Sequence, residues 1–291
     1  MTNTLFYFIQ NSIVFIIAGW AIYLVYRIGK LYYMPVSTMA AGAYFVAYAM
    51  KELHWPWFLA AIIVILAGGI MSFILSPGLV RASSFGVVVV TIGMLFIFRT
   101  VIRNIPVLGG EWGFLGIPKV NHIMPISIVL LIIIGVLINR LDNSRIGRAI
   151  GVTFNSEEAA KTLGINIFWL SVSLQVISGA LGGLAGALYA GSMSTLNVAA
   201  FSFDILLLLL IFVFVGGYTT MWGVAIATPI LYGIPVILPS AIADWRYIVY
   251  GFILIFILIF KPTGLIDKDL VRKIRIFIFS LFKRKIPKNS N

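Results

Sequence analysis

The sequence predicts an all-α protein, a polytopic transmembrane helical bundle of about 8 to 9 helices. Two observations carry this prediction. Apolar residues make up 61% of the 291 residues. Charged residues make up 10%, whereas a soluble domain usually has about a quarter. Long apolar runs also recur along the chain, and they lack the polar face that a helix on the surface of a soluble protein needs.

Nine apolar runs account for the predicted helices. A helix needs about 20 apolar residues to cross the roughly 30 Å of hydrocarbon in a bilayer. The runs are Leu5–Tyr26, Val36–Met50, Trp57–Leu75, Phe85–Ile102, Ile123–Ile138, Ile167–Ala190, Phe203–Val215, Trp222–Pro239 and Tyr247–Phe260. The second, seventh and ninth are short for a full crossing, so a tilted or re-entrant helix fits them as well, and the count is good to about one.

The basic residues predict an orientation. Nine alternating crossings place sixteen Lys and Arg residues on the side of the C-terminus and five on the side of the N-terminus. The positive-inside rule then makes the N-terminus outside and the C-terminus cytoplasmic. Most of the excess comes from the C-terminal tail. Arg27 and Lys30 follow the first run instead of preceding it, the reverse of a signal peptide, so we expect that run to remain as a helix.

The chain is expected to form one membrane domain, residues 1–262, followed by a basic tail, residues 263–291. In the tail, basic and apolar residues alternate at helical spacing, which predicts an amphipathic helix on the anionic cytoplasmic leaflet. Membrane lipid is therefore the expected partner of the net charge of +12. Nucleic acid is not expected as a partner, because the basic residues form no single face interleaved with aromatic residues.

The longest polar segment, residues 140–166, predicts a short helix outside the bilayer. Ser156 is a suitable N-cap, and Glu157 and Glu158 suit the positive end of the helix dipole. Gly164 is suited to end the helix in a left-handed conformation. We expect two helical turns here, joined by turns to the spans on both sides. The segment is either a well-capped connector or a functional element, and the pattern alone leaves both open.

Small residues at fixed spacing predict close helix packing. Gly179 and Gly183 form one pair four residues apart, and Gly182 and Gly186 form another. Such pairs let helix backbones approach each other in a membrane, although missing side chains also leave room for a substrate path. Further residues are candidates for packing or for the path: Gly42, Tyr44, Gly216 and Gly217.

Few polar residues lie within the spans. Thr91, Gln175 and Ser178 are candidates for a cavity or for bonds between helices, and so are Gln10, Asn11, Ser37, Thr38 and Ser192. Ionisable residues are almost absent there, which argues against a proton-driven carrier. His54 and His122 are far apart and there is no cysteine, so no catalytic residue, metal site or cofactor is expected, and the chain is not expected to be an enzyme.

Five motifs in order resemble the LIV family of branched-chain amino acid permeases, which belong to ABC importers. In chain order the motifs are residues 109–118, then Ser144-Arg145-Ile146-Gly147-Arg148-Ala149 with its continuation over residues 157–166, then residues 179–190, 215–223 and 260–265. In this family a short helix of the permease docks in a cleft of the ATPase. The resemblance implies a coupling loop made of Arg145, Gly147, Arg148, Glu157, Ala159, Ala160 and Gly164.

The resemblance also implies a function and partners. The function is that of a permease subunit translocating small amino acids, foremost branched-chain ones, across the cytoplasmic (inner) membrane. The implied partners are a second homologous permease subunit, two ABC ATPase subunits that bind the ATP, and an extracytoplasmic substrate-binding protein. Pro35 stands where the family commonly has His, which puts substrate identity in doubt. Urea or short amides as substrates, an ATP-independent carrier or channel, and an assembly factor remain alternatives.

Overall fold

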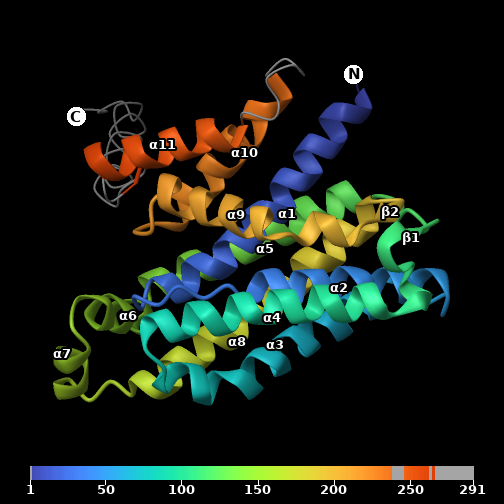
Figure 1. Ribbon diagram of the computed structural model, residues 1–291. Helices are drawn as coiled ribbons and strands as arrows, with labels where there is room; N and C mark the ends of the chain where they lie inside the picture. Colours follow the sequence, from blue (N-terminus) through green and yellow to red (C-terminus); the bar gives the residue numbers. More distant parts are fainter. Residues whose placement is uncertain (1, 238–245, 262–263, 266–291) are drawn as a thin grey trace, which may run out of the picture.

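The computed structural model describes residues 2–237, 246–261 and 264–265 of the chain. Within them, nine helices have 14 residues or more (Figure 1). These are α1 (Thr2–Tyr26), α2 (Met34–Lys51), α3 (Trp57–Arg81), α4 (Ser84–Asn104), α5 (Ile123–Asn143), α8 (Ile167–Ser192), α9 (Phe203–Gly216), α10 (Met221–Ile237) and α11 (Arg246–Phe260). The two shorter helices α6 (Arg145–Asn155) and α7 (Glu157–Thr162) join α5 to α8.

Each predicted run coincides with one of these nine helices, and the all-α prediction is confirmed. The largest differences are at the ends of α3 and α5, which continue past the predicted Leu75 to Arg81 and past the predicted Ile138 to Asn143. They do so because a helix ends where its backbone turns, not where its side chains stop being apolar. The predicted end of the eighth run, Pro239, and nearly all of the tail domain 263–291 lie outside the described residues.

Five helices of the described residues are long and apolar enough to cross a membrane: α1, α3, α4, α5 and α8. Helices α9, α10 and α11 are apolar but shorter. Helix α2 is a different case, because 14 of its 18 residues are buried within the bundle. A helix enclosed by other helices can carry small and polar residues, since it faces protein and not lipid.

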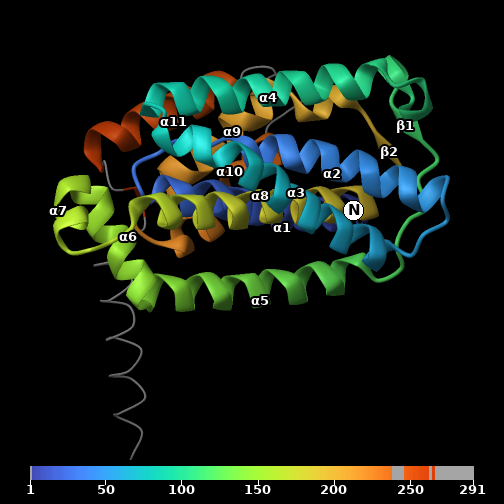
Figure 2. The ribbon, with the colours of Figure 1, turned by 90° about the horizontal axis from the view of Figure 1, so that it is seen from below.

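Helix α8 lies in the middle of the bundle and packs against α1, α2 and α3. Figure 2 shows α4 and α5 on opposite sides of this group. Only 22% of the apolar window of α4 and 28% of that of α5 are buried, against 89% for α1. The exposed apolar side chains of α3, α4 and α5 therefore form the surface that suits lipid.

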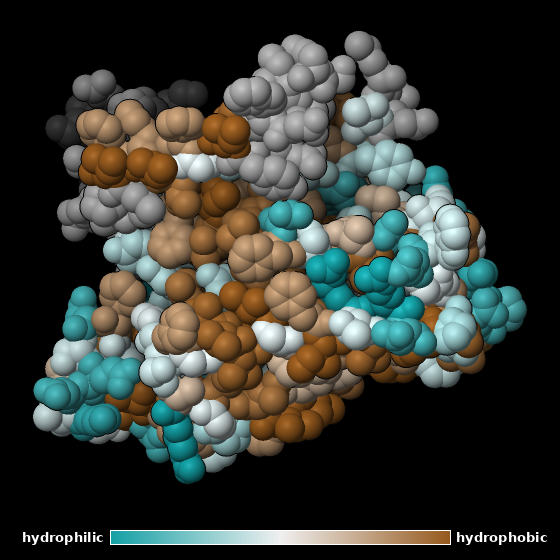
Figure 3. All heavy atoms as spheres, viewed as in Figure 1, coloured by the Kyte–Doolittle hydropathy of each residue, from teal (hydrophilic) through white to brown (hydrophobic). Residues whose placement is uncertain are grey.

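The helices run between two ends of the molecule. Helices α6 and α7 mark one end, here called the α7 end (Figure 1). The opposite β1 end carries the N-terminus, the strands β1 (Phe114–Leu115) and β2 (Thr195–Leu196), which pair antiparallel, and the 3-10 helices η1 (Pro106–Leu108), η2 (Gly110–Trp112) and η3 (Val198–Phe201). Hydrophilic side chains gather towards both ends, and hydrophobic ones cover the middle (Figure 3).

Helix α6 corrects one expectation from the sequence. The segment before Ser156 was expected to be a turn, but 11 of its residues form an amphipathic helix. Its buried face repeats at helical spacing with Gly147, Ile150 and Thr153. The arginines and glycines of this segment hide that pattern, because only one of its three buried residues is a large apolar one.

Candidate functional site

Helix α7 is a short helix with complete caps at both ends. The Ser156 hydroxyl accepts a hydrogen bond from the Ala159 N–H at 3.2 Å. At the other end Gly164 has a φ of +73°, and its N–H donates to the Lys161 carbonyl at 3.0 Å. The Ile165 N–H donates to the Ala160 carbonyl, also at 3.0 Å. This pair of bonds is a Schellman motif, which satisfies carbonyls that a helix end otherwise leaves unpaired.

Helix α6 begins at a sharp bend after α5. The Ser144 hydroxyl caps α6 by accepting hydrogen bonds from the N–H groups of Ile146 and Gly147, at 3.1 and 3.3 Å. A side chain at position 147 would lie less than 3.0 Å from the carbonyl oxygens of Leu141 and Asp142. Only glycine fits where the first turn of α6 crosses the last turn of α5, so Gly147 sets the angle between the two helices.

The predicted coupling residues fall into two groups. Gly147 and Ala160 are buried, and the others are exposed at the α7 end: Arg145, Arg148, Glu157, Ala159 and Gly164. Two large apolar side chains are exposed beside them, Ile146 at 51% and Leu163 at 68%. Exposed apolar residues between charged ones are typical of a surface that contacts another protein.

A buried ion pair fixes the junction of α5 and α6 to the end of α1. The Arg27 guanidinium pairs with the Asp142 carboxylate, and the side chains are 6% and 15% exposed. The Tyr23 hydroxyl donates a hydrogen bond to the second carboxylate oxygen of Asp142 at 2.9 Å. Both oxygens of the carboxylate are therefore used, as a buried charge requires.

Lys30 connects the loop between α1 and α2 to its surroundings. Its ammonium group is buried and donates a hydrogen bond to the Val80 carbonyl at 2.8 Å. Burial lowers the pKa of Lys30, and the negative charge of Glu157 raises it in opposition. The first turn of α7 therefore acts electrostatically on the body of the bundle.

The turn between α9 and α10 completes the α7 end. Tyr218 packs its ring against Tyr26 and Phe154, with ring centroids 5.4 and 5.5 Å apart. The backbone of Gly216 touches that of Gly223, and the backbone of Gly217 touches that of Gly264, each too closely for a side chain. A cavity of about 230 Å³ lies between α1, α6 and this turn; its lining residues are Arg27, Gly151, Phe154, Asn155, Tyr218 and Thr219.

The glycines of α8 contact two different helices. A side chain at Gly179 or Gly183 would lie less than 3.0 Å from backbone oxygens of α3. A side chain at Gly182 or Gly186 would lie equally close to backbone oxygens of α2. Gly42 on α2 in turn lies against the Gly183 carbonyl. The structure thus places the two glycine pairs on two faces of α8, one for each neighbour.

Most of the polar candidates bond within the bundle. The Ser178 hydroxyl donates to the Ala21 carbonyl at 2.7 Å, and Thr91 donates to the Val87 carbonyl at 2.7 Å. The same holds for Gln10, Asn11, Thr38 and Ser192. Gln175 is different, because neither its amide oxygen nor its amide nitrogen has a partner among the described residues. The hydroxyls of Ser37 and Tyr44 likewise have none there.

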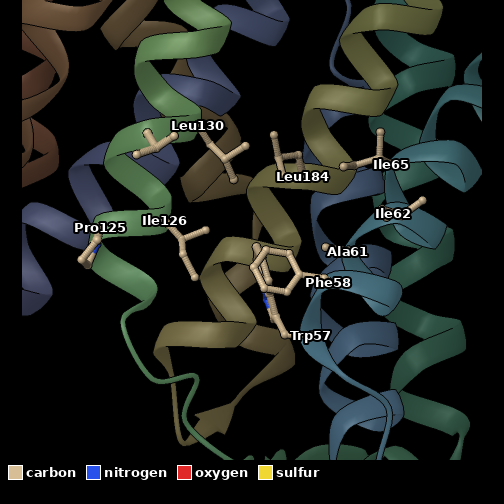
Figure 4. Close-up of a pocket in the computed structure, with 10 residues that line it drawn as sticks. Trp57, Phe58, Ala61, Ile62, Ile65, Pro125, Ile126, Leu130 and Leu184 are labelled. Carbon is tan, nitrogen blue, oxygen red and sulfur yellow. The ribbon is translucent and has the colours of Figure 1, made fainter.

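An apolar groove lies on the lipid-facing side, and sequence reasoning did not find it. It has a volume of about 430 Å³ between α3, α5 and α8 (Figure 4). Its lining residues are Trp57, Phe58, Ala61, Ile62, Ile65, Pro125, Ile126, Val129, Leu130 and Leu184. It brings together residues far apart in the sequence, so no local pattern could predict it. The groove offers hydrocarbon only and suits no charged substrate.

No group of His, Cys, Asp and Glu residues within the described chain could hold a metal ion. The histidines, His54 and His122, each have a positive φ and precede α3 and α5 at the β1 end. Such positions are common for turn residues, and here they place the imidazoles on separate connections. The candidate site consists of α6, α7 and the helix ends around them.

Comparison with known proteins finds similarity to transport permeases. Residues 4–258 match the family model described as the permease component of the branched-chain amino acid transport system. A curated protein of Methanocaldococcus jannaschii, described as the probable branched-chain amino acid transport permease protein LivM, is 24% identical over 236 residues, covering 72% of this chain and 67% of that protein. No solved structure matches the chain.

Proposed function

The chain belongs to the family of branched-chain amino acid transport permease components, and we propose that it is one permease subunit of an ABC importer. The family is one of transport permeases and not of enzymes, and several helices of this multi-pass membrane protein can span a membrane. In the proposed function, ATP hydrolysis in two partner subunits drives a small amino acid, foremost a branched-chain one, across the cytoplasmic membrane. A second permease subunit and an extracytoplasmic binding protein complete the importer.

The observation that carries this proposal is the form of the α6 and α7 unit. It stands out from the helix bundle at the α7 end (Figure 1). Its exposed side combines Arg145, Arg148 and Glu157 with the apolar Ile146 and Leu163. A capped helix with such a surface is suited to enter a cleft of another protein, and the charges can fix its register there.

Contacts on the inner side of this unit give a route for movement. A displacement of α7 passes to α6, which is joined to α5 at Ser144. From there the Arg27 and Asp142 pair reaches α1, and Tyr218 reaches the turn between α9 and α10. Because α1 packs on α8, the motion of one exposed element reaches the centre of the bundle.

Reversal of the charge at position 157 tests the proposal. In the complex reconstituted with its ATPase and binding protein, we expect Glu157→Lys to abolish uptake and stimulation of the ATPase, because it removes the charge that fixes the register of α7. Membrane insertion should be normal. The matched control is Glu52→Lys, the same reversal at the β1 end, which should leave ATPase stimulation intact. Normal uptake by Glu157→Lys would contradict the proposal, and uptake by the chain alone without ATP would establish a carrier instead.

A further inference from the structure

The apolar core of the described bundle consists of two clusters, and polar and small residues lie between parts of them. The larger cluster reaches both ends of the molecule, from Leu196 at the β1 end to Met221 at the α7 end, and on α3, α4 and α8 it includes Val64, Leu95 and Leu184. The smaller one lies near the α7 end and includes Leu79, Val87 and Leu174. Between these positions α3 carries Ser72 and Ser76, α4 carries Thr91, and α8 carries Gln175, Ser178, Gly179, Gly182 and Gly183. We call these eight residues the polar layer.

The layer lies inside the membrane-spanning part of the molecule. Gln175 is the ninth residue of α8, which places it about 12 Å along the helix axis from the start of α8 at a rise of 1.5 Å per residue. At this depth an unpaired polar group has no water to bond to in a lipid bilayer. Each polar side chain of the layer therefore needs a partner from the protein or from a ligand.

Gln175 and Ser72 are the members of the layer whose side-chain polar groups lack a partner among the described residues, and Gln175 has two unpaired atoms where Ser72 has one. It is fully buried, and its amide oxygen and amide nitrogen are both unpaired within the described residues. Ser178, three residues further and equally buried, donates its hydroxyl proton to Ala21. A polar residue kept for structure bonds as Ser178 does, because a buried unpaired amide destabilises the fold.

The glycines of α8 show which neighbour Gln175 faces. Gly179 and Gly183 face α3, and Gly182 and Gly186 face α2. At 100° per residue, position 175 lies at the angle midway between Gly182 and Gly186 around the axis of α8, so Gln175 is on the side towards α2. Pro35 in the first turn of α2 contacts α8 at Gly182, and Gln175 lies about two turns of α8 further towards the α7 end.

We propose that Gln175, on the side of α8 that faces α2, contacts the ammonium and carboxylate groups of the transported amino acid during passage. The chemistry of the amide fits both groups, since its oxygen accepts a hydrogen bond from an ammonium and its NH₂ donates to a carboxylate. The inference rests on the proposed function and adds a contact residue to it. The layer supplies polar groups within the membrane-spanning part of α3, α4 and α8, without the charged residues that would hold a zwitterion too strongly to release it.

The absence of cysteine in the chain allows a direct test. The Gln175→Cys and Ser178→Cys variants are reconstituted with ATPase and binding protein in proteoliposomes. A small water-soluble methanethiosulfonate reagent is then applied with and without ATP turnover. We expect Gln175→Cys to react at least tenfold faster than the matched Ser178→Cys during turnover, and saturating leucine, isoleucine or valine to slow that reaction. Equal rates in the two variants, or a rate that none of the three amino acids slows, overturn the inference.

A second variant separates a transport role from a structural one. Gln175→Leu removes the unpaired amide, so we expect a melting temperature equal to or above that of the wild type, together with an uptake rate at least tenfold lower. A lower melting temperature with normal uptake per folded complex assigns Gln175 to packing and overturns the inference. The proposed function itself is judged on the wild-type complex: absence of ATP-dependent uptake of the three amino acids there refutes it, whatever the variants do.

Discussion

Two ion pairs at opposite ends of the molecule show how the burial of a charge changes its contribution to stability. Arg27 and Asp142 are almost enclosed, while Arg103 and Glu111 form an ion pair with both side chains more than half exposed. A buried pair has lost the water that would otherwise stabilise each charge, so removing one partner leaves the other uncompensated. An exposed pair returns to water with little change in free energy.

We therefore expect Asp142→Asn to lower the free energy of unfolding by about 3–5 kcal/mol, because Arg27 keeps its buried charge without a counter-charge. Glu111→Gln, the control at the exposed pair, should change it by about 0–1 kcal/mol. Thermal unfolding of the purified variants in the same detergent measures both. Similar melting temperatures for the two variants would mean that the Arg27 and Asp142 pair is not an anchor of the α5 and α6 junction.

At this scale the sequence predicted capping well and pairing poorly. Ser156 and Gly164 act through their own neighbours in the chain, so a local pattern identifies them. The pairing of Arg27 with Asp142 depends on how α1 packs against α5, and no local sequence pattern predicts it. The sequence analysis assigned Gly147 to the coupling loop by resemblance alone. The structure shows why this position needs a glycine: α5 and α6 cross here too closely for a side chain.

At the scale of elements, α8 holds the bundle together through close backbone contacts. Glycine pairs on two of its faces bring α2 and α3 within a distance that no side chain would allow. Dispersion contacts and short interhelical distances take the place of the hydrophobic effect, which is weak between helices in lipid. The spacing of the glycines predicted close packing, but the partners follow only from the three-dimensional arrangement.

Gly183→Ala should destabilise the bundle by about 1–3 kcal/mol, because the new methyl group would overlap the Val64 carbonyl and force α3 away from α8. Gly93→Ala is the control, since nothing lies within 4 Å of a methyl group there, and alanine in a helix should be neutral or stabilising by up to about 1 kcal/mol. Chemical denaturation of both variants decides the matter. A loss of stability by Gly93→Ala as large as that by Gly183→Ala would refute the packing explanation.

Helix α6 marks the limit of sequence reasoning about elements. The nine apolar runs were found because continuous hydrophobicity is a strong signal. Helix α6 has only 11 residues, with two arginines and two glycines, and its buried face has one large apolar residue, Ile150. The Ser144 cap and the packing of its buried face on the bundle stabilise α6 as a helix. The packing depends on the three-dimensional arrangement, so a sequence pattern does not predict it.

For the whole molecule, the positions of the two ends make the predicted orientation testable. The N-terminus lies at the β1 end, opposite α6 and α7 (Figure 1). The same end carries Lys51 and Glu52, and the sequence predicts that it faces outside. Which end faces the cytoplasm rests on the count of basic residues, and eight of the sixteen on the predicted cytoplasmic side lie in the tail outside the described residues.

Single cysteines in this naturally cysteine-free chain determine the orientation. We expect Glu158→Cys, exposed on α7, to react with a membrane-impermeant maleimide only in inverted vesicles. Glu52→Cys, exposed at the end of α2, should react only in right-side-out vesicles or intact cells. Labelling of Glu158→Cys from the outside would reverse the orientation and would remove α7 from reach of a cytoplasmic ATPase.

The direct joint between α5 and α6 has a mechanical consequence. A single residue, Ser144, separates the two helices, so α6 has no slack and pivots as a rigid arm of about 16 Å for its 11 residues. A rotation of about 10° at the Ser144 pivot would swing the far end of such an arm by roughly 3 Å, more than half a helical turn. If the proposed ATPase partner binds α7 and moves it, α6 would rotate about Ser144. The rotation would then act directly on Asp142, whose carboxylate is bonded to Arg27 and Tyr23, and not on a flexible loop.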